Sequence, residues 1–226
     1  GVGGDEIFGG YNSFQQVPGI AKFFSIFQFM PMVGRTIRIL SAPIVRQLVS
    51  PKYASIFEYG STLEDAYFLR RGLFMPWELP EILEPSLVRA GLEEISISKR
   101  LKDSIFGARS NRIAITALET SWYLNHQLLR DSDWAGMANS LEIRTPLVDV
   151  TFLRKLAPML AGNHPPTKRH LAQSPSLQLP AEIINRRKTG FNVPIPQWII
   201  PNENAGKKVN MRQWAQFVYS QQWSGD

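Results

Sequence analysis

Residues 111–129 read NRIAITALETSWYLNHQLL, the longest uninterrupted helical pattern in the chain. Apolar side chains recur there at three- and four-residue steps, which is the spacing of one face of an amphipathic α-helix. The residues that can share this face are Ile115, Leu118, Trp122 and Leu129. Glu119 and Asn125 fall elsewhere on the same helix. The segment therefore predicts a long helix and favours a mainly α-helical chain.

Shorter helical patterns flank this segment, and proline and glycine separate them. Between residues 20 and 53 we expect short helices divided at Pro31, Gly34 and Pro43. Thr62 is expected to begin a helix that runs to Phe74. Further helices are predicted over residues 79–90, 147–160 and 211–221, and a loop rich in proline and basic residues over 162–176. No alternation typical of a strand extends beyond a few residues.

The composition is that of a globular protein with a positive surface. Hydrophobic residues make up 44% of the 226 residues and charged residues 19%, so the chain is expected to fold. There is no cysteine, which excludes disulfides and thiolate chemistry and is compatible with the cytoplasm, the location that we expect. A net charge of +6 favours phosphate-bearing partners, among which ATP, nucleic acid and anionic lipid all qualify. No apolar run is long enough for a transmembrane helix, so stable membrane insertion is not expected.

The first of three chemically suggestive segments is GVGGDEIFGGY, residues 1–11. Gly3 and Gly4 allow backbone N–H groups to approach a ligand closely. Asp5 and Glu6 then place two carboxylates where a divalent cation bridging phosphates would be held. The alternative is a glycine turn with acidic residues that only starts a helix. Such a turn normally follows a strand, so we expect that strand upstream of Gly1.

The second and third segments carry charged residues near small ones. Residues 128–149 place Glu142, Arg144 and Asp149 after a run of small residues, and the alternative is a structural turn held by ion pairs. Residues 185–198 read NRRKTGFNVPIPQW, in which Arg187 and Lys188 precede a glycine. A lysine ammonium suits a phosphate or a developing oxyanion, whereas a solvated basic patch is the alternative.

Together and in this order, the three segments resemble the C-terminal synthetase domain of the glutamine-hydrolysing asparagine synthetases and their relatives, the β-lactam and carbapenam synthetases. The matching motifs are GGDE at residues 3–6 with FGGY at 8–11, MANSLEIR at 137–144, and RKTGF at 187–191. The resemblance implies that the chain is the helical C-terminal part of an α/β domain of the adenine-nucleotide-hydrolase (ATP pyrophosphatase) type. Residues 1–200 would then belong to the synthetase domain and residues 201–226 to its helical tail.

The resemblance also implies a reaction and a set of site residues. ATP, with magnesium, would adenylate aspartate or a related carboxylate, and ammonia from a separate glutaminase domain would attack the product. Asp5 matches the magnesium position of the family, and Lys188 matches its charge-stabilising lysine. The residues implied in nucleotide binding are Gly3, Gly4, Asp5, Glu6, Arg187 and Lys188. Glu142 and Arg144 are counted with Lys188 in the catalytic set, where they would hold the surrounding scaffold.

The sequence also departs from the family pattern. Val2 stands where members carry glutamate or tyrosine, and valine can neither transfer a proton nor donate a hydrogen bond. Trp134 and Gly136 replace the more usual arginine and serine of the second motif. The ATP-gripping loop and the catalytic cysteine of the glutaminase domain do not occur in these residues. We therefore expect this segment alone to be inactive and to be part of a longer protein.

Two other functions fit the same residues. One is a non-catalytic scaffold or pseudoenzyme derived from the family, which Val2 favours. The other is a basic module that binds a membrane surface or nucleic acid, indicated by Phe23, Phe24 and Phe27 beside Lys22, Arg35 and Arg38. We expect no nucleic-acid partner, since basic helices are usually solvated faces. Apolar helix faces left uncovered would allow the chain to form a homo-oligomer.

Overall fold

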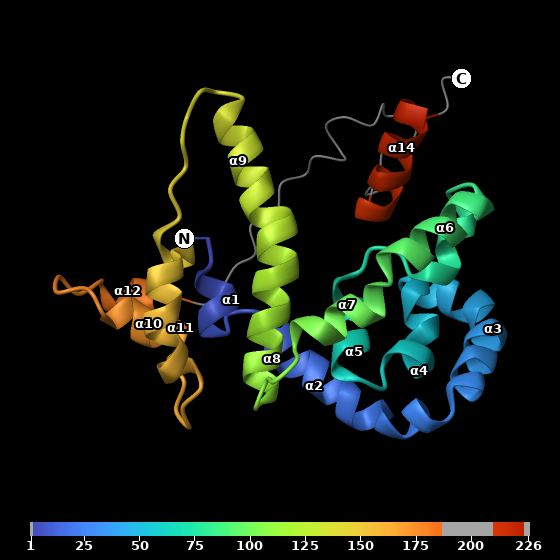
Figure 1. The fold of residues 1–226 in the computed structure, drawn as a ribbon, viewed down its shortest axis with the longest axis horizontal. Coiled ribbons are helices and arrows are strands. Elements are labelled where there is room, and N and C mark those ends of the chain that lie inside the picture. Colours follow the sequence, from blue (N-terminus) through green and yellow to red (C-terminus); the bar gives the residue numbers. More distant parts are fainter. Residues whose placement is uncertain (1, 187–209, 224–226) are drawn as a thin grey trace. The chain divides into compact units, whose positions relative to one another are not determined.

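The structure is a computed structural model that describes residues 2–186 and 210–223. Every regular element among these residues is helical, as expected, and no strand occurs among them. The chain divides into two compact units, one of residues 1–71 and 95–185 and the other of residues 72–94 and 186–226. Figure 1 shows the helices in chain order.

The first unit holds most of the helices. Its N-terminal elements are α1 (Gly4–Phe8), α2 (Ser13–Phe24), η1 (Ser25–Phe29), α3 (Pro31–Leu48), η2 (Pro51–Ser55), α4 (Ile56–Tyr59) and α5 (Leu63–Arg71). The chain returns with α7 (Ile97–Ser104), α8 (Asn111–Leu118), the π-helical segment η4 (Glu119–Leu129) and α9 (Arg130–Met137). It continues through η5 (Pro146–Val148), α10 (Val150–Leu160), α11 (Lys168–Gln173) and α12 (Ala181–Ile184).

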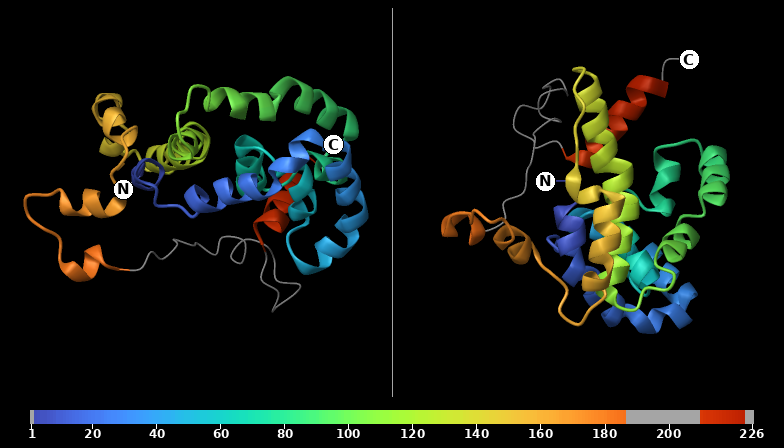
Figure 2. Two further views of the ribbon diagram at one scale, coloured as in Figure 1. Left: turned by 90° about the horizontal axis from the view of Figure 1, so that it is seen from below. Right: turned by 60° about the vertical axis from the view of Figure 1, so that its left-hand side comes forward.

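The long helix predicted from residue 111 is confirmed and extends beyond the predicted end. Figures 1 and 2 show α8, η4 and α9 as one continuous rod, which ends at Met137 rather than at Leu129. Ser110 caps its start by accepting a hydrogen bond from the backbone N–H of Ile113 at 3.3 Å. Its middle is a π-helix, a form that is rare and is often found at functional sites.

Two hydrophobic clusters stabilise the first unit. The larger cluster contains Val17, Ala66, Tyr67, Leu101, Ile115 and Leu118, from helices α2, α5, α7 and α8. The smaller one contains Ile7, Phe8 and Leu156 and joins α1 to α10. Partly buried Leu171 of α11 packs against this second cluster. The glycine-rich first turn is therefore anchored by apolar side chains that follow it directly.

The second unit contains η3 (Pro76–Glu81), α6 (Pro85–Ile95, of which Ile95 lies across the boundary) and α14 (Met211–Trp223). Glu78 is almost fully buried, accepts a hydrogen bond from the backbone N–H of Met75 at 2.8 Å, and forms an ion pair with Arg212. Arg212 also donates to the Leu73 carbonyl oxygen at 2.6 Å and lies over the Phe74 ring. These contacts connect α14 to η3 within the unit.

Three sequence-based expectations about helix boundaries were wrong. Helix α3 runs unbroken through Gly34 and Pro43. A Cβ atom at Gly34 would lie 2.6 Å from the Phe57 carbonyl oxygen, so this glycine permits close packing of α3 on α4 instead of ending a helix. Residues 168–173 form α11 inside the predicted loop, where Thr167 and His170 make a reciprocal N-terminal cap. The helix expected over 79–90 is divided into η3 and α6, because Pro85 begins a new helix.

Candidate functional site

The first chemical segment forms a tight turn and the short helix α1. Gly3 has a φ angle of +94°, a conformation that L side chains rarely adopt. A Cβ atom there would lie 2.9 Å from Cγ2 of Val148. Gly10 is equally constrained, because a Cβ atom at this position would overlap Oδ1 of Asp5. The glycines around α1 thus allow the backbone to lie directly against the Asp5 carboxylate and against η5.

Asp5 lies in the first turn of α1, and its side chain is 23% exposed. Its Oδ1 atom is 2.8 Å from Nζ of Lys168, the first residue of α11. Lys168 had been placed in a loop by the sequence pattern, and no motif singled it out as a partner. The structure therefore adds a cation to the acidic turn, supplied by a helix more than 160 residues away along the chain.

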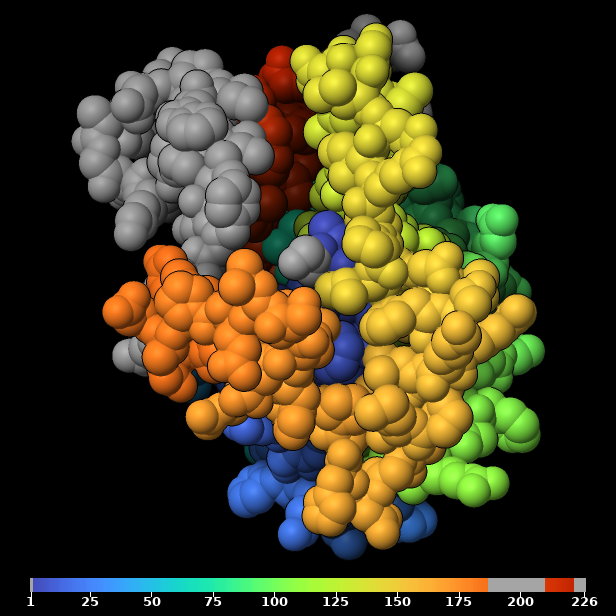
Figure 3. Space-filling model, turned by 90° about the vertical axis from the view of Figure 1, so that its left-hand side faces the viewer, coloured from blue at the N-terminus to red at the C-terminus, as the bar shows by residue number. Residues whose placement is uncertain are grey.

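The first and second chemical segments lie together. Besides the approach of Gly3 to Val148, a Cβ at Gly4 would lie 3.4 Å from Cδ1 of Leu147. Val148 also lines an open groove of about 840 Å³, whose walls include Glu142, Arg144 and Asp149. Figure 3 shows the N-terminal segment, in blue, recessed between the orange region of α11 and α12 and the gold region of η5 and α10.

Glu142 and Arg144 pair with each other in this groove. Their Oε1 and Nε atoms are 3.2 Å apart, and the side chains are 75% and 85% exposed. Such an exposed pair contributes little to stability. Asp149 accepts a hydrogen bond from the backbone N–H of Phe152 at 2.8 Å and so caps α10, which agrees with a structural role for this residue.

Most of the third chemical segment lies outside the described residues, which include only its first two residues, Asn185 and Arg186. Arg187 and Lys188 lie outside the described residues, so their implied roles in nucleotide binding and charge stabilisation stay predictions. The site that the structure describes consists of the acidic turn, Lys168 and the groove beside η5.

A buried network next to this turn was not anticipated from the sequence. Glu119 had been placed away from the apolar helix face, but it is fully buried at the start of η4. Its carboxylate accepts hydrogen bonds from Arg71 at 2.8 and 3.2 Å, from Tyr67 at 3.4 Å, and from Ser13. A lone acidic residue within a strongly apolar helical pattern was the signal available in the sequence.

Arg71 joins this network to the acidic turn through two aromatic rings. Its guanidinium carbon is 3.9 Å from the Tyr123 ring centroid and 4.7 Å from that of Tyr11. The Tyr11 hydroxyl donates to Oε1 of Glu6 at 2.7 Å. A chain of polar and cation–π contacts therefore runs from Glu6, adjacent to Asp5, to Glu119.

The environment of the network changes the protonation behaviour of its members. Burial, followed by the hydrogen bond to Glu6, raises the pKa of Tyr11, and burial with the Glu119 charge raises that of Tyr67. Burial lowers the pKa of Arg71, but the Glu119 carboxylate outweighs this effect, so the pKa rises on balance. At neutral pH both tyrosines are therefore protonated donors and Arg71 is a cation.

A second arginine, Arg112, supports the acidic turn through backbone carbonyl groups. Arg112 of α8 donates from Nη2 to the carbonyl oxygens of Ile7, at 3.2 Å, and Pro166, at 3.3 Å. Its guanidinium lies over the Phe14 ring, with 4.8 Å between the guanidinium carbon and the ring centroid. The Ile7 contact satisfies a carbonyl in the last turn of α1, and the Pro166 contact ties the segment before α11 to the same place. Burial lowers the pKa of Arg112.

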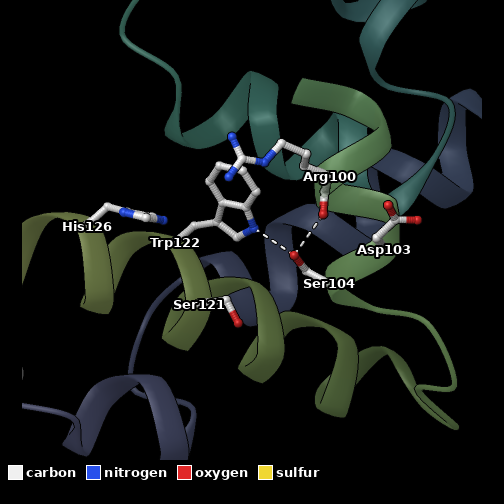
Figure 4. A pocket seen from close by; sticks show the side chains of 6 residues that line it. All are labelled: Arg100, Asp103, Ser104, Ser121, Trp122 and His126. Carbon is white, nitrogen blue, oxygen red and sulfur yellow. Dashed lines mark hydrogen bonds between the residues drawn. The ribbon is translucent and has the colours of Figure 1, made fainter. Parts of the chain in front are cut away.

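Another groove of the first unit is separate from this site. It has a volume of about 460 Å³ and is lined by Arg100, Asp103, Ser104, Ser121, Trp122 and His126 (Figure 4). Its central polar atoms bond to one another: Trp122 Nε1 donates to Ser104 Oγ at 3.0 Å, and Ser104 donates to the Arg100 carbonyl oxygen at 2.8 Å. The groove therefore lies where α7 packs against η4, and the hydrogen bond between Trp122 and Ser104 joins the two helices there.

No group of three or more His, Cys, Asp or Glu side chains suited to a metal ion occurs in residues 2–186 and 210–223. The charged contact at the Asp5 carboxylate is with the Lys168 ammonium.

Comparison with known proteins supports the family resemblance of the sequence. Residues 1–221 match the asparagine synthase family model. The chain is 25% identical over 222 residues to glutamine-hydrolysing asparagine synthetase 1 of Bacillus subtilis, across 96% of this chain and 32% of that protein. It is 27% identical over 212 residues to putative glutamine-hydrolysing asparagine synthetases of Mycobacterium bovis and Mycobacterium tuberculosis, across 90% of this chain and 30% of each relative. No solved structure matches.

The chain belongs to the asparagine synthase family, a family of carbon–nitrogen ligases. It spans about a third of the length of the curated relatives that it matches.

Proposed function

We propose that this chain is the helical C-terminal part of the synthetase domain of an ATP-dependent, glutamine-hydrolysing amide ligase. The domain would be of the α/β adenine-nucleotide-hydrolase type, with residues 1–200 in its main body and 201–226 as a helical tail. Aspartate or a related carboxylate is adenylated, and ammonia from a glutaminase domain completes the amide. The cytoplasm, where ATP and glutamine are available, is the location that fits this reaction.

The observation that carries this proposal is the position of Asp5. Its carboxylate is held in the first turn of α1, against the backbone of Gly10 and 2.8 Å from Lys168. Magnesium keeps several waters and is typically bound by one or two carboxylates together with substrate phosphates. A single, partly buried carboxylate with a cation beside it therefore fits magnesium pyrophosphate better than it fits a free metal ion.

The physical demand of the reaction is neutralisation of negative charge. A carboxylate that attacks an α-phosphate is repelled unless cations absorb the charge, and a bound magnesium ion supplies part of that neutralisation. In this chain Asp5 would hold the metal, the N–H groups around Gly3 and Gly4 would face phosphate oxygens, and Glu6 would fix the turn through Tyr11. We assign Lys168, Arg187 and Lys188 to the phosphate charge.

Glu142 and Arg144 are proposed as the scaffold of the groove beside η5. Their mutual pairing at high exposure fits a role in shaping the groove better than a role in proton transfer, because side chains this exposed are surrounded mainly by water. Val2, at the start of the turn, supplies no proton donor, so the identity of the carboxylate substrate rests on the rest of the site.

The test uses the protein at its full natural length. With magnesium, ATP, ammonia and a panel of carboxylates led by aspartate, we expect AMP and pyrophosphate to form in equal amounts. The variant Asp5→Asn should reduce the rate by about a hundredfold or more, since metal-site changes one step further out already cost 10–100-fold. It should also weaken magnesium-dependent binding of pyrophosphate measured by calorimetry.

Asp103→Asn is the matched control, because Asp103 is an exposed aspartate on α7, away from the acidic turn. It should leave both the rate and pyrophosphate binding unchanged. If the full-length protein binds neither magnesium-ATP nor magnesium pyrophosphate, the ligase proposal fails and the non-catalytic scaffold becomes the better description. Equal loss in both variants would show that Asp5 has no special role.

A further inference from the structure

One long segment of this chain carries only positive charge. Between Glu6 and Glu58 there is no acidic residue, whereas five basic residues occur: Lys22, Arg35, Arg38, Arg46 and Lys52. The segment covers α2, η1, α3 and η2. Such a one-sided distribution is complementary to an anionic surface.

The same segment exposes large apolar side chains in unusual number. From the end of α2 into α3 the exposed residues are Phe23, Ile26, Phe29, Met30, Met32 and Val33. Phe24 and Phe27 turn inward, with their rings 5.2 and 5.0 Å from that of Phe57. The inner aromatic residues therefore fix the bend, while the outer ones are left on the surface.

Helix α3 continues this apolar surface and adds a basic edge. Met32, Leu40, Ile44 and Leu48 are exposed along it, with Leu40 73% exposed. Arg35 and Arg46 are exposed too, and they are eleven residues apart, about three helical turns, so they lie on the same side of the helix. At about 100° per residue, both arginines also lie beside Met32, at the edge of the exposed apolar residues of α3. We call Ile26, Phe29, Met32, Leu40, Ile44 and Leu48 the α3 face.

The inner side of α3 is already occupied. Gly34 lies against the backbone of Phe57, and Arg38 is paired with Glu58 at 2.6 Å. Figure 1 shows α4 on the inner side of α3. The α3 face is thus the side of the helix that these packing contacts do not use.

No single helix of the described residues is long and apolar enough to cross a membrane. The pair formed by Ser13–Phe29 and Pro31–Leu48 reaches the required length and composition only together and is bent by 111°. A bent, basic, apolar pair that includes exposed phenylalanines has the properties of an element that lies in a membrane interface.

We propose that the α3 face is a peripheral membrane-binding surface whose partner is an anionic phospholipid bilayer. Phe29 and the apolar stripe of α3 enter the boundary between headgroups and acyl chains, and Lys22, Arg35 and Arg46 contact lipid phosphates. This inference goes beyond the proposed ligase activity and does not depend on it.

The charge pattern favours lipid over protein occupants of this surface. Two copies of the chain that met through the same face with antiparallel α3 helices would bring Arg35 and Arg46 of each copy toward those of the other, and like charges repel. A covering protein domain would have to supply carboxylates along the whole basic edge. An anionic bilayer supplies both the phosphates and the apolar layer.

The experiment measures binding of the full-length protein to vesicles. We expect co-sedimentation with vesicles of phosphatidylglycerol and phosphatidylcholine, much weaker binding to phosphatidylcholine alone, and a decrease at high salt. Phe29→Asp with Leu40→Asp should abolish binding. The control is Phe106→Asp, because Phe106 is 95% exposed on the α7–α8 connection, outside the α3 face, and should bind as the unmodified protein does.

The charge contribution is tested separately with variants that leave the apolar surface intact. Each basic residue near an anionic surface strengthens binding several-fold, so Arg35→Glu with Arg46→Glu should weaken it by at least about tenfold. Lys99→Glu with Lys102→Glu on α7 is the matched control and should have little effect. Circular dichroism establishes that each variant is folded, and the arginine pair tests the proposal even where an aspartate variant does not fold.

Several results would overturn the proposal. Failure to bind anionic vesicles at low salt is one of them, and so is binding that the Arg35 and Arg46 changes leave unaffected. If the aspartate variants instead convert a dimer into a monomer, the occupant is a second copy. If the α3-face variants lose vesicle binding and keep ligase activity, this surface is separate from the catalytic site. If they lose ligase activity and still bind vesicles, the lipid proposal is refuted.

Discussion

Replacement of Glu119 by Gln isolates the charge of the buried network from its shape. Glutamine has the size of glutamate and keeps one carbonyl oxygen, but it cannot balance the charge of Arg71. Its NH₂ group also faces donors, since Arg71, Tyr67 and Ser13 all donate to Glu119 in the native structure. The substitution therefore removes the counter-charge and adds a donor among donors.

The expected magnitude follows from the burial of the two partners. Removing one member of a buried ion pair costs about 3–5 kcal/mol because the other charge is left uncompensated. Arg71 is 25% exposed on its side chain and lies against the rings of Tyr11 and Tyr123, so solvent and the rings compensate part of the loss. We expect Glu119→Gln to lower the free energy of unfolding by about 3 kcal/mol.

Urea unfolding followed by circular dichroism measures this loss, as a lower midpoint with an unchanged slope. Glu142→Gln is the matched control, because it makes the same change in an ion pair that lies almost entirely in solvent, and it should change stability by less than about 0.5 kcal/mol. Equal effects of the two substitutions would refute the reasoning, because they would show that burial adds nothing to the Glu119 contacts.

Two further predictions concern glycine packing and alkaline pH. Gly10→Ala should destabilise the protein by about 1–3 kcal/mol, because the new methyl group overlaps the carboxylate of Asp5. Gly91→Ala should stabilise it by roughly 0.5–1 kcal/mol, because Gly91 lies in helix α6 with open space where the methyl group would be. Thermal unfolding distinguishes the two signs. The raised pKa of Tyr67 favours its protonated form in the folded state, so its contribution to stability is full below the ordinary pKa of 10.0 and is lost as pH rises from there toward the raised value. In urea titrations above pH 10, Tyr67→Phe should lose less stability than the unmodified protein, and an identical decline in both would contradict the assignment.

The sequence predicted the helices best where apolar periodicity was long. The helix that begins at Asn111 was predicted with its correct start, and the cap by Thr62 is present, since its Oγ1 atom accepts from the Asp65 backbone N–H at 3.3 Å. Proline and glycine were poorer guides. Gly34 was interpreted as a helix break although it permits close packing on α4, and that distinction depends on what lies opposite the glycine.

Local motifs likewise gave only half of the candidate site. The acidic glycine turn and the segment around Val148 were found because their residue types are unusual at short spacing. Lys168, Arg112 and Arg71 were missed because each acts across a long separation in the chain, and isolated basic residues carry no pattern. Their partners become apparent only when the helices are packed.

The sequence by itself determined the helical character of the chain, its family, its excess of positive charge and the identity of Asp5 as a candidate metal ligand. These properties depend on residue type, order and local spacing, which a linear pattern preserves. The tertiary structure alone decided that Lys168 faces Asp5, that Glu119 is buried and that the α3 face remains exposed. Packing brings distant residues into contact and selects which face of each helix loses water, and neither outcome is encoded in a local window of sequence.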